Sequence, residues 1–483
     1  MSTPFADRAA PANRWVALAF IALAQLMVAL DATIVSIALP SVQRALHFSD
    51  AQRQWVVTAY TLPFAGLLLL GGRIADSIGR KRAFLIGLAG FAAASALGGA
   101  APDLRVLACA RSLQGAFAAL LSPTALSLLA VTFTEPRERA KAFAVYGGIA
   151  GSGGAVGLVL GGALTEMASW RWCLYVNVAV AVIAFLGARR VLGSAPGSGA
   201  LRADVPGVLL VIGGLVAAVY GCTSALSAGW GSTNVLALFA VAFVLLALFV
   251  AQEARTANPL LPLHIVADRN RGGACLSAAL AIVGMFGLFL LLTYYFQVVL
   301  HYTPVAAGLS FLPMTAASLF GATTLASQLL PRVPPRALMA PGLLTAAIGM
   351  ALLTRIHAES RYLTDILPAE VAVGLGIGCA MITAFSVATQ GVSPRDAGVA
   401  SASVNAAQQV GGSMGTALLN TIAAGASAGY AASRVSAPKL EILVHGYSTA
   451  AACASGILLA AAVIAAFMIT LPKPHRGPNA PAP

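Results

Sequence analysis

Charged residues are scarce in this chain. Only 9% of its 483 residues are Asp, Glu, Lys or Arg, whereas 59% are apolar. A water-soluble domain carries about 25% charged residues, so the shortage excludes a soluble enzyme. The mean hydropathy of +0.86 indicates that the chain is surrounded by lipid. The natural unit of its organisation is therefore the membrane-spanning helix rather than the globular domain.

Clusters of reactive side chains are missing as well. The six cysteines lie far apart, without the spacing of a metal or redox site, and the six histidines fall in predicted loops or tails. The sequence contains no P-loop with which to hydrolyse ATP. We therefore expect no metal, no cofactor and no enzymatic activity. A transport function is favoured over a membrane-embedded enzyme.

Basic residues outnumber acidic ones and give the chain a net charge of +13. They recur in short clusters between apolar runs, and this pattern argues against nucleic acid as a partner. Lys and Arg are held on the cytoplasmic side of membrane proteins. Most of the 29 Lys and Arg residues fall on that side if the N-terminus is inside. We expect a multi-pass protein of the bacterial inner membrane with both termini cytoplasmic.

Fourteen stretches of the chain are long and apolar enough to cross a lipid bilayer, which takes about 20 residues. The first stretch is too long for a cleaved signal peptide and carries Asp31, so we expect it to be retained. An even number of crossings places both termini on one side. The predicted spans are residues 15–38, 54–72, 83–101, 104–131, 142–164, 172–192, 206–226, 233–252, 273–297, 304–329, 337–356, 364–388, 397–424 and 448–471.

Short matches recur along the chain at one fixed offset. Pro136-Arg137-Glu138 returns as Pro394-Arg395-Asp396, an offset of 258 (394 − 136), which also carries Gly153-Gly154 onto Gly411-Gly412. Secondary transporters are often built from such duplicated bundles. The sequence predicts an all-α integral membrane fold with 14 transmembrane helices, arranged as two pseudo-symmetric six-helix bundles plus an inserted helix pair. The predicted domains are residues 1–192, an insert at 193–271, residues 272–472, and a proline-rich disordered tail at 473–483.

Three ionisable residues are candidates for positions deep in the predicted spans, where a charge near the middle of the bilayer costs about 2.5–3.5 kcal/mol on insertion scales. They are Asp31, Arg111 and Glu370. Asp31 and Arg111 lie at similar depths, roughly 12 Å below the outer surface, so the two can pair. A static pair joining spans 1 and 4 is the alternative, but buried ion pairs are weak evidence for stability. We assign all three residues to proton coupling. Glu370 either faces the same cavity from the other bundle or, because it follows Asp365 and Pro368 close to the outer end, reaches water.

Neutral polar side chains inside the spans form a second group. They line a substrate cavity or bond across helices as packing contacts, and the sequence leaves both roles open. Asn405 shares one helical face with Gln408 and Gln409, because residues three and four apart are neighbours. The cavity candidates are Gln25, Gln114, Asn177, Tyr294, Gln297, Asn405, Gln408 and Gln409.

Glycines crowd the fifth predicted span, among them Gly153, Gly157, Gly161 and Gly162. They leave almost no side chains to hold neighbouring helices apart. We therefore expect close backbone approach and bending in this span. Ordinary small-residue packing is the alternative to a helix that slides between two conformations.

Three stretches carry recognisable motifs. Span 1 ends with the run from Leu30 to Pro40, a glycine- and arginine-containing loop from Gly72 to Arg82 follows span 2, and span 4 carries Arg111-Ser112-Leu113-Gln114-Gly115. Together they resemble motifs of the major facilitator superfamily, specifically its fourteen-span drug:proton antiporter branch. The resemblance covers nearly the whole chain. Span 5 departs from the pattern because Leu158 stands where that branch usually has proline, which weakens the expected kink.

The resemblance implies roles for these motifs. The motif at Arg111 is linked with proton transfer. The loop after span 2 is a latch that holds the two bundles in the outward-open state and loosens on switching. The latch residues are Gly72, Asp76, Gly79, Arg80 and Arg82.

The function implied by the resemblance is export of apolar or amphipathic drugs and toxic compounds from the cytoplasm, in exchange for protons. The alternative is an exporter or uniporter of a native metabolite, such as a sugar, an amino acid, a siderophore or a self-made antibiotic. The predicted outer loops are too short to form a conduit across a second membrane. Such a conduit would require a periplasmic adaptor as partner.

Overall fold

The computed structural model describes residues 11–49, 52–193, 197, 204–256, 259, 263–390, 392, 397–434 and 436–471. The predicted tail at 473–483 lies outside this part of the chain. Every regular element within the described residues is a helix, and the all-α prediction is confirmed.

The helices follow one another with short connections. The first eight are α1 (Pro11–Leu46), α2 (Gln54–Ile78), α3 (Arg80–Gly99), α4 (Leu104–Thr132), α5 (Pro136–Met167), α6 (Trp172–Val191), α7 (Val205–Ala228) and α8 (Thr233–Arg255). The remainder are α9 (Leu263–Val266), α10 (Arg269–Tyr294), η1 (Tyr295–Val299), α11 (Pro304–Ser310), α12 (Leu312–Phe320), η2 (Gly321–Ala326), α13 (Ser327–Leu329), α14 (Arg336–Leu352), η3 (Leu353–Arg355), η4 (Tyr362–Ile366), α15 (Leu367–Thr389), α16 (Ala397–Ser433) and α17 (Lys439–Met468).

All fourteen predicted spans fall in helical segments, but fewer qualify as membrane crossings. Within the described residues, twelve helices are long and apolar enough, or thirteen if α2, bent by 58° between Leu68 and Leu70, is one span. The predicted span at 397–424 lies in α16, which is not among them. The reason is its composition, because polar residues such as Asn405, Gln408 and Asn420 recur along it. The predicted count of fourteen crossings is therefore not confirmed by this criterion.

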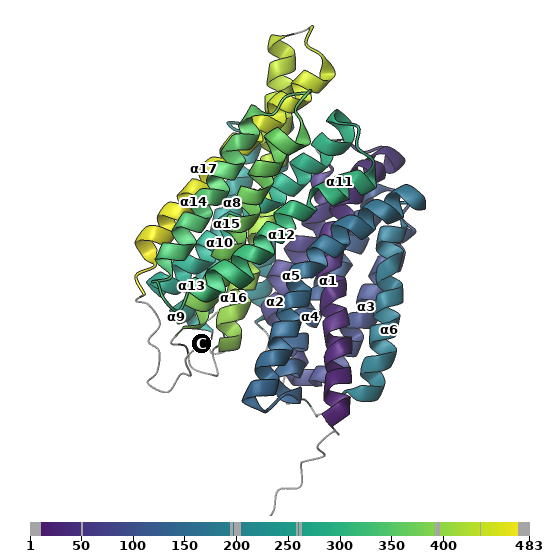
Figure 1. The fold of residues 1–483 in the computed structure, drawn as a ribbon, viewed down its shortest axis with the longest axis vertical. Helices are drawn as coiled ribbons and strands as arrows, with labels where there is room; N and C mark the ends of the chain where they lie inside the picture. The colour runs from purple at the N-terminus through teal and green to yellow at the C-terminus, as the bar shows by residue number, and fades with distance from the viewer. Residues whose placement is uncertain are drawn as a thin grey trace, which may run out of the picture.

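The N-terminal and C-terminal helices form two groups that lie side by side (Figure 1). In the first group α1 packs against α5 and α6, and α4 packs against α2 and α3. In the second, α10 packs against α16 and α17, and α14 packs against α15 and α17. The inserted helices α7 and α8 pair with each other, and α7 also touches α2 and α16. The insert therefore contacts both groups.

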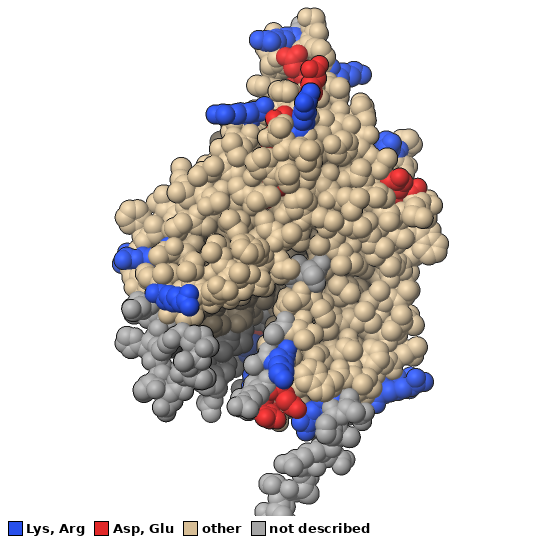
Figure 2. Space-filling model, in the orientation of Figure 1, with Lys and Arg blue, Asp and Glu red and all other residues tan. Residues whose placement is uncertain are grey.

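The two groups meet at one end of the molecule, where α1, α5 and α10 finish and α11 begins. We call this the closed end. There Gln297 Nε2 donates to the carbonyl of Ile37 at 2.9 Å, and the backbone N–H of Val305 donates to Glu166 Oε2 at 3.1 Å. Toward the opposite end, where the chain begins, Figure 2 shows the surface hollowed between the two groups. The molecule is thus sealed at one end and open at the other.

On the face shown in Figure 2, charged side chains gather toward the two ends of the molecule, and the band between them is almost free of charge. Large apolar residues are exposed along the membrane-length helices, for example Leu236, Phe243 and Leu248 on α8. An exposed apolar surface of this extent requires lipid around it. The band fits a protein that crosses a bilayer many times.

A helical hairpin projects from the closed end. Helix α16 continues to Ser433 and α17 begins at Lys439, past the predicted limits of 424 and 448 (Figure 1). The ring of Tyr430 stacks on His445 with centroids 4.4 Å apart, and Arg434 Nη1 lies 3.8 Å from Glu441 Oε1. Hydropathy misses these turns because they are polar and extend beyond the apolar run.

Candidate transport site

A buried ion pair lies at the centre of the N-terminal group. Asp31 on α1 is completely buried, and its Oδ2 atom lies 2.6 Å from Nη1 of Arg111 on α4. Its other oxygen, Oδ1, accepts hydrogen bonds from Asn177 Nδ2 at 2.7 Å and from Gln114 Nε2 at 3.1 Å. Both carboxyl oxygens therefore act as acceptors. Three donors converge on one side chain, an arrangement that suits an ionised carboxylate.

Arg111 is held by further contacts. Its Nε donates to the carbonyl of Val56 at 3.1 Å, and its Nη1 donates to Gln114 Oε1 at 2.9 Å. The guanidinium carbon lies 4.4 Å from the ring centroid of Tyr60 on α2, a cation–π geometry. Gln114 in turn donates to Ser95 Oγ of α3 at 2.7 Å. The cluster draws side chains or backbone from α1, α2, α3, α4 and α6.

The sequence of α4 explains how Arg111 reaches this position. Asp103 caps the helix by accepting the backbone N–H of Val106 at 2.9 Å, which fixes where the first turn begins. Arg111 and Gln114 are three residues apart and therefore point to the same face. That face meets α1 and α2, because α4 packs against both helices.

Glycines bring α5 against α1. A Cβ atom on Gly157 would lie 2.2 Å from Thr33 Oγ1, and one on Gly161 would lie 2.8 Å from the carbonyl of Ile34. A Cβ on Gly153 would lie 2.8 Å from that of Ala29. These three glycines are four residues apart and form one face, so α5 lies directly on the segment of α1 that carries Asp31. Gly162 faces the other group, where a Cβ would lie 2.4 Å from the carbonyl of Pro304.

Glu370 lies in the C-terminal group, away from the Asp31 cluster. It is completely buried in the first turn of α15. Its Oε2 atom is 3.1 Å from the hydroxyl of Tyr362, whereas Oε1 is buried with no hydrogen-bond partner. The structure therefore separates the three predicted proton-coupling residues into one ion pair and one isolated acid.

The predicted cavity residues occupy four different places. Gln114 and Asn177 bond Asp31, as described above, and Gln25 accepts a hydrogen bond from Tyr146 of α5 at 2.6 Å. Tyr294, whose hydroxyl donates to Gln43 Oε1, lies with Gln297 at the closed end. The α16 side chains of Asn405, Gln408 and Gln409 are half-buried.

Most of the predicted latch loop is helical, since α2 runs to Ile78 and α3 begins at Arg80. It contacts the insert as well as the N-terminal group, because Arg73 Nη2 donates to the carbonyl of Pro259. Gly79 joins α2 to α3 with φ +94°, a conformation that favours glycine. Arg80 Nη2 lies 3.3 Å from Asp76 Oδ1, and the Asp76 side chain is 64% exposed. Arg82 is exposed, and Gly72 is half-buried beside Pro123 of α4. Asp76 thus bonds its own neighbour rather than the second group.

A polar bridge that the sequence did not single out joins the two groups at the closed end. Asn420 on α16 accepts from Arg53 Nε at 2.5 Å and donates from Nδ2 to Gln54 Oε1 at 2.8 Å. Gln54 Nε2 donates to Thr223 on α7. The guanidinium of Arg53 also lies 4.1 Å from the ring centroid of Tyr294. The sequence feature that could have located this bridge is that Asn420 and Gln54 are polar residues in apolar surroundings.

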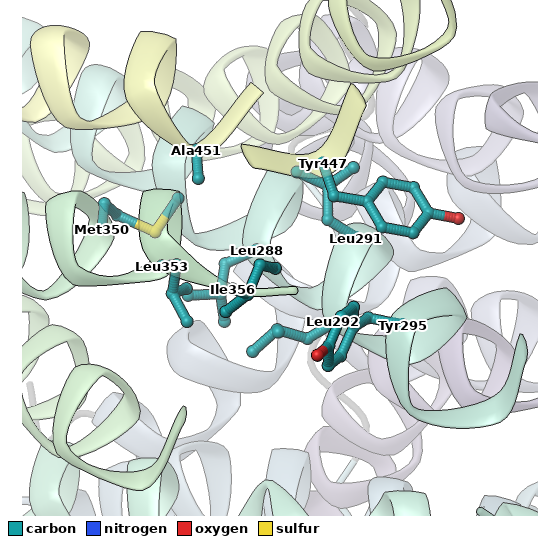
Figure 3. A pocket seen from close by; sticks show the side chains of 9 residues that line it. All are labelled: Leu288, Leu291, Leu292, Tyr295, Met350, Leu353, Ile356, Tyr447 and Ala451. Atoms are coloured by element: carbon teal, nitrogen blue, oxygen red, sulfur yellow. The ribbon is translucent and has the colours of Figure 1, made fainter. Parts of the chain in front are cut away.

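A small apolar pocket, with room for little more than one water molecule, lies inside the C-terminal group (Figure 3). All of its lining side chains belong to that group, and the hydroxyl of Tyr295 is already bonded to the carbonyl of His357 at 2.6 Å. A transport cavity opens first to one side of the membrane and then to the other. A pocket within one group is not exposed in this way when the two groups move. The lining residues are Leu288, Leu291, Leu292, Tyr295, Met350, Leu353, Ile356, Tyr447 and Ala451.

Comparison with known proteins places this architecture in a family. The family model described as Major Facilitator Superfamily matches residues 21–416. The chain belongs to the Major Facilitator Superfamily. This is a family of transporters, and membership confirms the expectation from the sequence motifs.

Several relatives carry names that refer to antibiotics. The chain is 53% identical to a puromycin resistance protein of Streptomyces alboniger, over 95% of this chain and 92% of that protein. It is 37% identical to a cephamycin export protein of Amycolatopsis lactamdurans, covering 86% of each. It is 34% identical to a tetracenomycin C resistance and export protein of Streptomyces glaucescens, over 85% and 76% of the two chains.

A solved structure shares the fold. A bacterial homologue of the human lysosomal transporter Spinster, in an inward-facing and unoccupied conformation, superposes with a TM-score of 0.70. The match covers 95% of this chain and 98% of that one, at 17% sequence identity. The likeness at this identity concerns the fold alone.

Proposed function

We propose that the protein is a proton-coupled exporter of amphipathic antibiotics and related toxic compounds. The observation that carries this proposal is the ion pair of Asp31 and Arg111, buried among apolar helices beside a glycine-lined contact. An ionisable pair in such a place is expensive to keep, and exporters use such pairs to couple a proton to movement. The names of the relatives support the substrate class.

The proposed topology has fourteen crossings, with α16 as the crossing that is too polar to qualify on hydropathy. Helix α16 packs against α2, α7, α10 and α17, so its polar side chains face protein rather than lipid over much of their length. Intramembrane polar residues are tolerated in such positions. Both termini then lie in the cytoplasm, and the closed end faces outward.

The structure then corresponds to the state that is open to the cytoplasm. In this state Asp31 is ionised, because three donors converge on its two oxygens. Substrate enters the hollow between the two groups, where Asn405, Gln408 and Gln409 on α16 supply polar contacts. The latch loop is expected to be loose in this state, and the exposed Asp76 fits that expectation.

Protonation of Asp31 is the proposed driving step. A neutral carboxyl loses its attraction for Arg111, and its added hydrogen conflicts with the donors of Asn177 and Gln114. Gly153, Gly157 and Gly161 place no side chains of α5 between α5 and α1. The two helices can therefore shift relative to each other when Asp31 becomes neutral. The two states differ in proton affinity, and this difference is sufficient to drive transport.

The test is export by purified protein in liposomes under an imposed proton gradient, with puromycin as the probe. Asp31→Asn removes the proton site and keeps the size of the side chain. Gradient-driven transport of puromycin is therefore expected to fall to the level of empty liposomes. Glu359→Gln is the matched control, because Glu359 is an exposed acid. Full gradient-driven transport by Asp31→Asn would reject the proposal.

A second candidate function is export of an antibiotic made by the same cell. The relatives named for puromycin and tetracenomycin C come from Streptomyces species and favour this candidate over sugars or amino acids. A screen of such compounds with and without a proton gradient separates the two. Broad, gradient-dependent recognition indicates a multidrug exporter, and recognition of one compound indicates a dedicated one.

A further inference from the structure

The hydroxyl of Tyr362 lies between two oxygen atoms. It is 2.7 Å from the carbonyl oxygen of Ser310, the last residue of α11, and 3.1 Å from Oε2 of Glu370. The second carboxyl oxygen of Glu370, Oε1, is buried without a hydrogen-bond partner. A chain of three groups therefore runs from α15 through η4 to α11.

Counting hydrogens decides how this chain is bonded. A tyrosine hydroxyl has one hydrogen to donate, and a carbonyl oxygen and an ionised carboxylate are acceptors only. If Glu370 is ionised, Ser310 and Glu370 compete for that one hydrogen. If Glu370 is protonated, it donates to Tyr362 and Tyr362 donates to Ser310, so both contacts are satisfied. The geometry fits the protonated acid, since a buried carboxylate with an unbonded oxygen is costly.

No positive group offsets a charge on Glu370 within the described residues. Of the elements packed against α15, α12, η2 and α16 contain no Asp, Glu, Lys, Arg or His. Arg269 and Arg271 on α10 and Arg336 on α14 stand at the far ends of their helices. On η4, Asp365 accepts the backbone N–H of Arg361, and Tyr295 and Tyr302 are the neighbouring phenols. The remaining charged and titratable residues before α15 are exposed, namely Arg355, His357, Glu359 and Arg361.

The hydrogen bonds from Glu370 through Tyr362 to Ser310 hold α11 in place. Helix α11 forms part of the contact that shuts the closed end. A Cβ on Gly308 would lie 2.4 Å from the carbonyl of Leu158 on α5, so the two backbones are in close contact. Gly162 makes the reciprocal approach to Pro304, and Val305 N–H bonds Glu166. Moving α11 away from α5 is therefore part of opening this end.

We propose that Glu370 is a second protonation site, whose proton holds the closed end shut through Tyr362 and Ser310. When Glu370 releases the proton to solvent, the Tyr362 hydroxyl keeps its hydrogen but turns to donate to the carboxylate, and the carbonyl of Ser310 loses its donor. Helix α11 is then released from η4, and its contact with α5 opens. Asp31 and Glu370 thus act differently, since Asp31 is ionised and Glu370 is neutral in the same conformation. This proposal rests on the proposed function in one respect only, namely that the closed end faces outward.

Spin labels at Met167 and Leu309, both exposed and at the ends of α5 and α11, report the distance across the seal. The measurement uses purified full-length protein without substrate or gradient, with Cys109, Cys222 and Cys453 replaced by Ser. In the otherwise unaltered protein the distance is expected to lengthen from mildly acidic to alkaline pH. Glu370→Gln is expected to stay closed throughout, and Tyr362→Phe to be open throughout. A normal pH response in either variant would overturn the proposal.

Two further measurements separate this proposal from the proposed function. Asp31→Asn is expected to keep the pH response of the α5–α11 distance even where transport is lost, and Glu359→Gln serves as the exposed-acid control. Infrared spectra provide a readout that does not depend on movement. The stretching band of a protonated carboxyl is expected in the unaltered protein at neutral pH and absent from Glu370→Gln. Identical spectra for the two would overturn the assignment.

Discussion

Asn177 Nδ2 lies 2.7 Å from Asp31 Oδ1, while Arg111 occupies the other oxygen of the same carboxylate. The two bonds come from α6 and α4, so the acid on α1 fastens three helices together. An acid held from both sides responds to a proton with more than a change of charge, because the new hydrogen meets donors on either oxygen. This arrangement is the basis of the predictions that follow.

The shape of the arginine is predicted to matter as much as its charge. Arg111→Lys keeps the positive charge but cannot maintain the separate bonds to Val56 and Asp31 made by Nε and Nη1. We expect gradient-driven efflux in inverted vesicles to fall at least about tenfold, equivalent to roughly 1.4 kcal/mol. Arg105→Lys, on the same helix but exposed, is the control and is expected to transport normally. Equal activity of the two variants would contradict a specific role for the guanidinium.

Removing one member of the ion pair is predicted to destabilise the protein more than removing both. Asp31→Leu leaves Arg111 charged and buried, at a cost of about 3–5 kcal/mol. The double variant Asp31→Leu with Arg111→Met carries no buried charge and is expected to recover much of that loss. Thermal unfolding in detergent measures both effects. A double variant that is less stable than either single one would show that the two side chains do not act as a pair.

The contact between α5 and α1 is predicted to tolerate no added methyl group at Gly157. A Cβ there would lie 2.2 Å from Thr33 Oγ1 and 2.8 Å from the carbonyl of Leu30. Gly157→Ala is expected to lower stability by about 1–3 kcal/mol, as overpacking does, and to reduce transport. Gly148→Ala on the same helix is the control, because nothing lies within 4 Å of its Cβ position. A harmless Gly157→Ala would show that α5 does not pack as described.

The polar bridge at Asn420 is predicted to keep the closed end shut. Asn420→Ala removes the bonds to Arg53 and Gln54, and the closed state is expected to become less populated. Cys222 is buried where α7 meets α2 and α16, so its reaction with a maleimide, followed by mass spectrometry of its peptide, reports opening. We expect faster labelling in Asn420→Ala than in the unaltered protein. Thr345→Ala, at a half-buried position on α14 whose hydroxyl donates to the carbonyl of Pro341 in the same helix, should label at the original rate.

The sequence predicted much of this architecture because lipid imposes simple rules. Apolar runs located the helices, and the cost of burying ions identified Asp31 and Arg111. The glycines of span 5 predicted close backbone approach, but only the structure shows that α1 is the partner. Hydropathy placed the end of one helix at 424 and the start of the next at 448, but α16 and α17 continue as a polar hairpin.

The hydrogen-bond partners of the polar side chains were harder to predict than the positions of the helices. Gln114 and Asn177 were candidates for a substrate cavity or for bonds across helices, and the structure places them on Asp31, because polarity shows that a side chain needs a partner but does not say which. The bridge from Arg53 to Asn420 joins residues 367 positions apart. This bridge forms where the two helix groups come together at the closed end. A local sequence pattern does not predict contacts between the groups. The behaviour of the latch loop likewise depends on the conformational state.

Substrate-driven proton movement tests the central claim most directly. Liposomes containing the purified protein and a pH-sensitive dye are given an outward substrate gradient with no initial pH difference. The account predicts that substrate leaving through the protein drives protons in, so the interior acidifies, and that Asp31→Asn abolishes this while Glu359→Gln does not. Proton movement of normal size in Asp31→Asn would contradict the account.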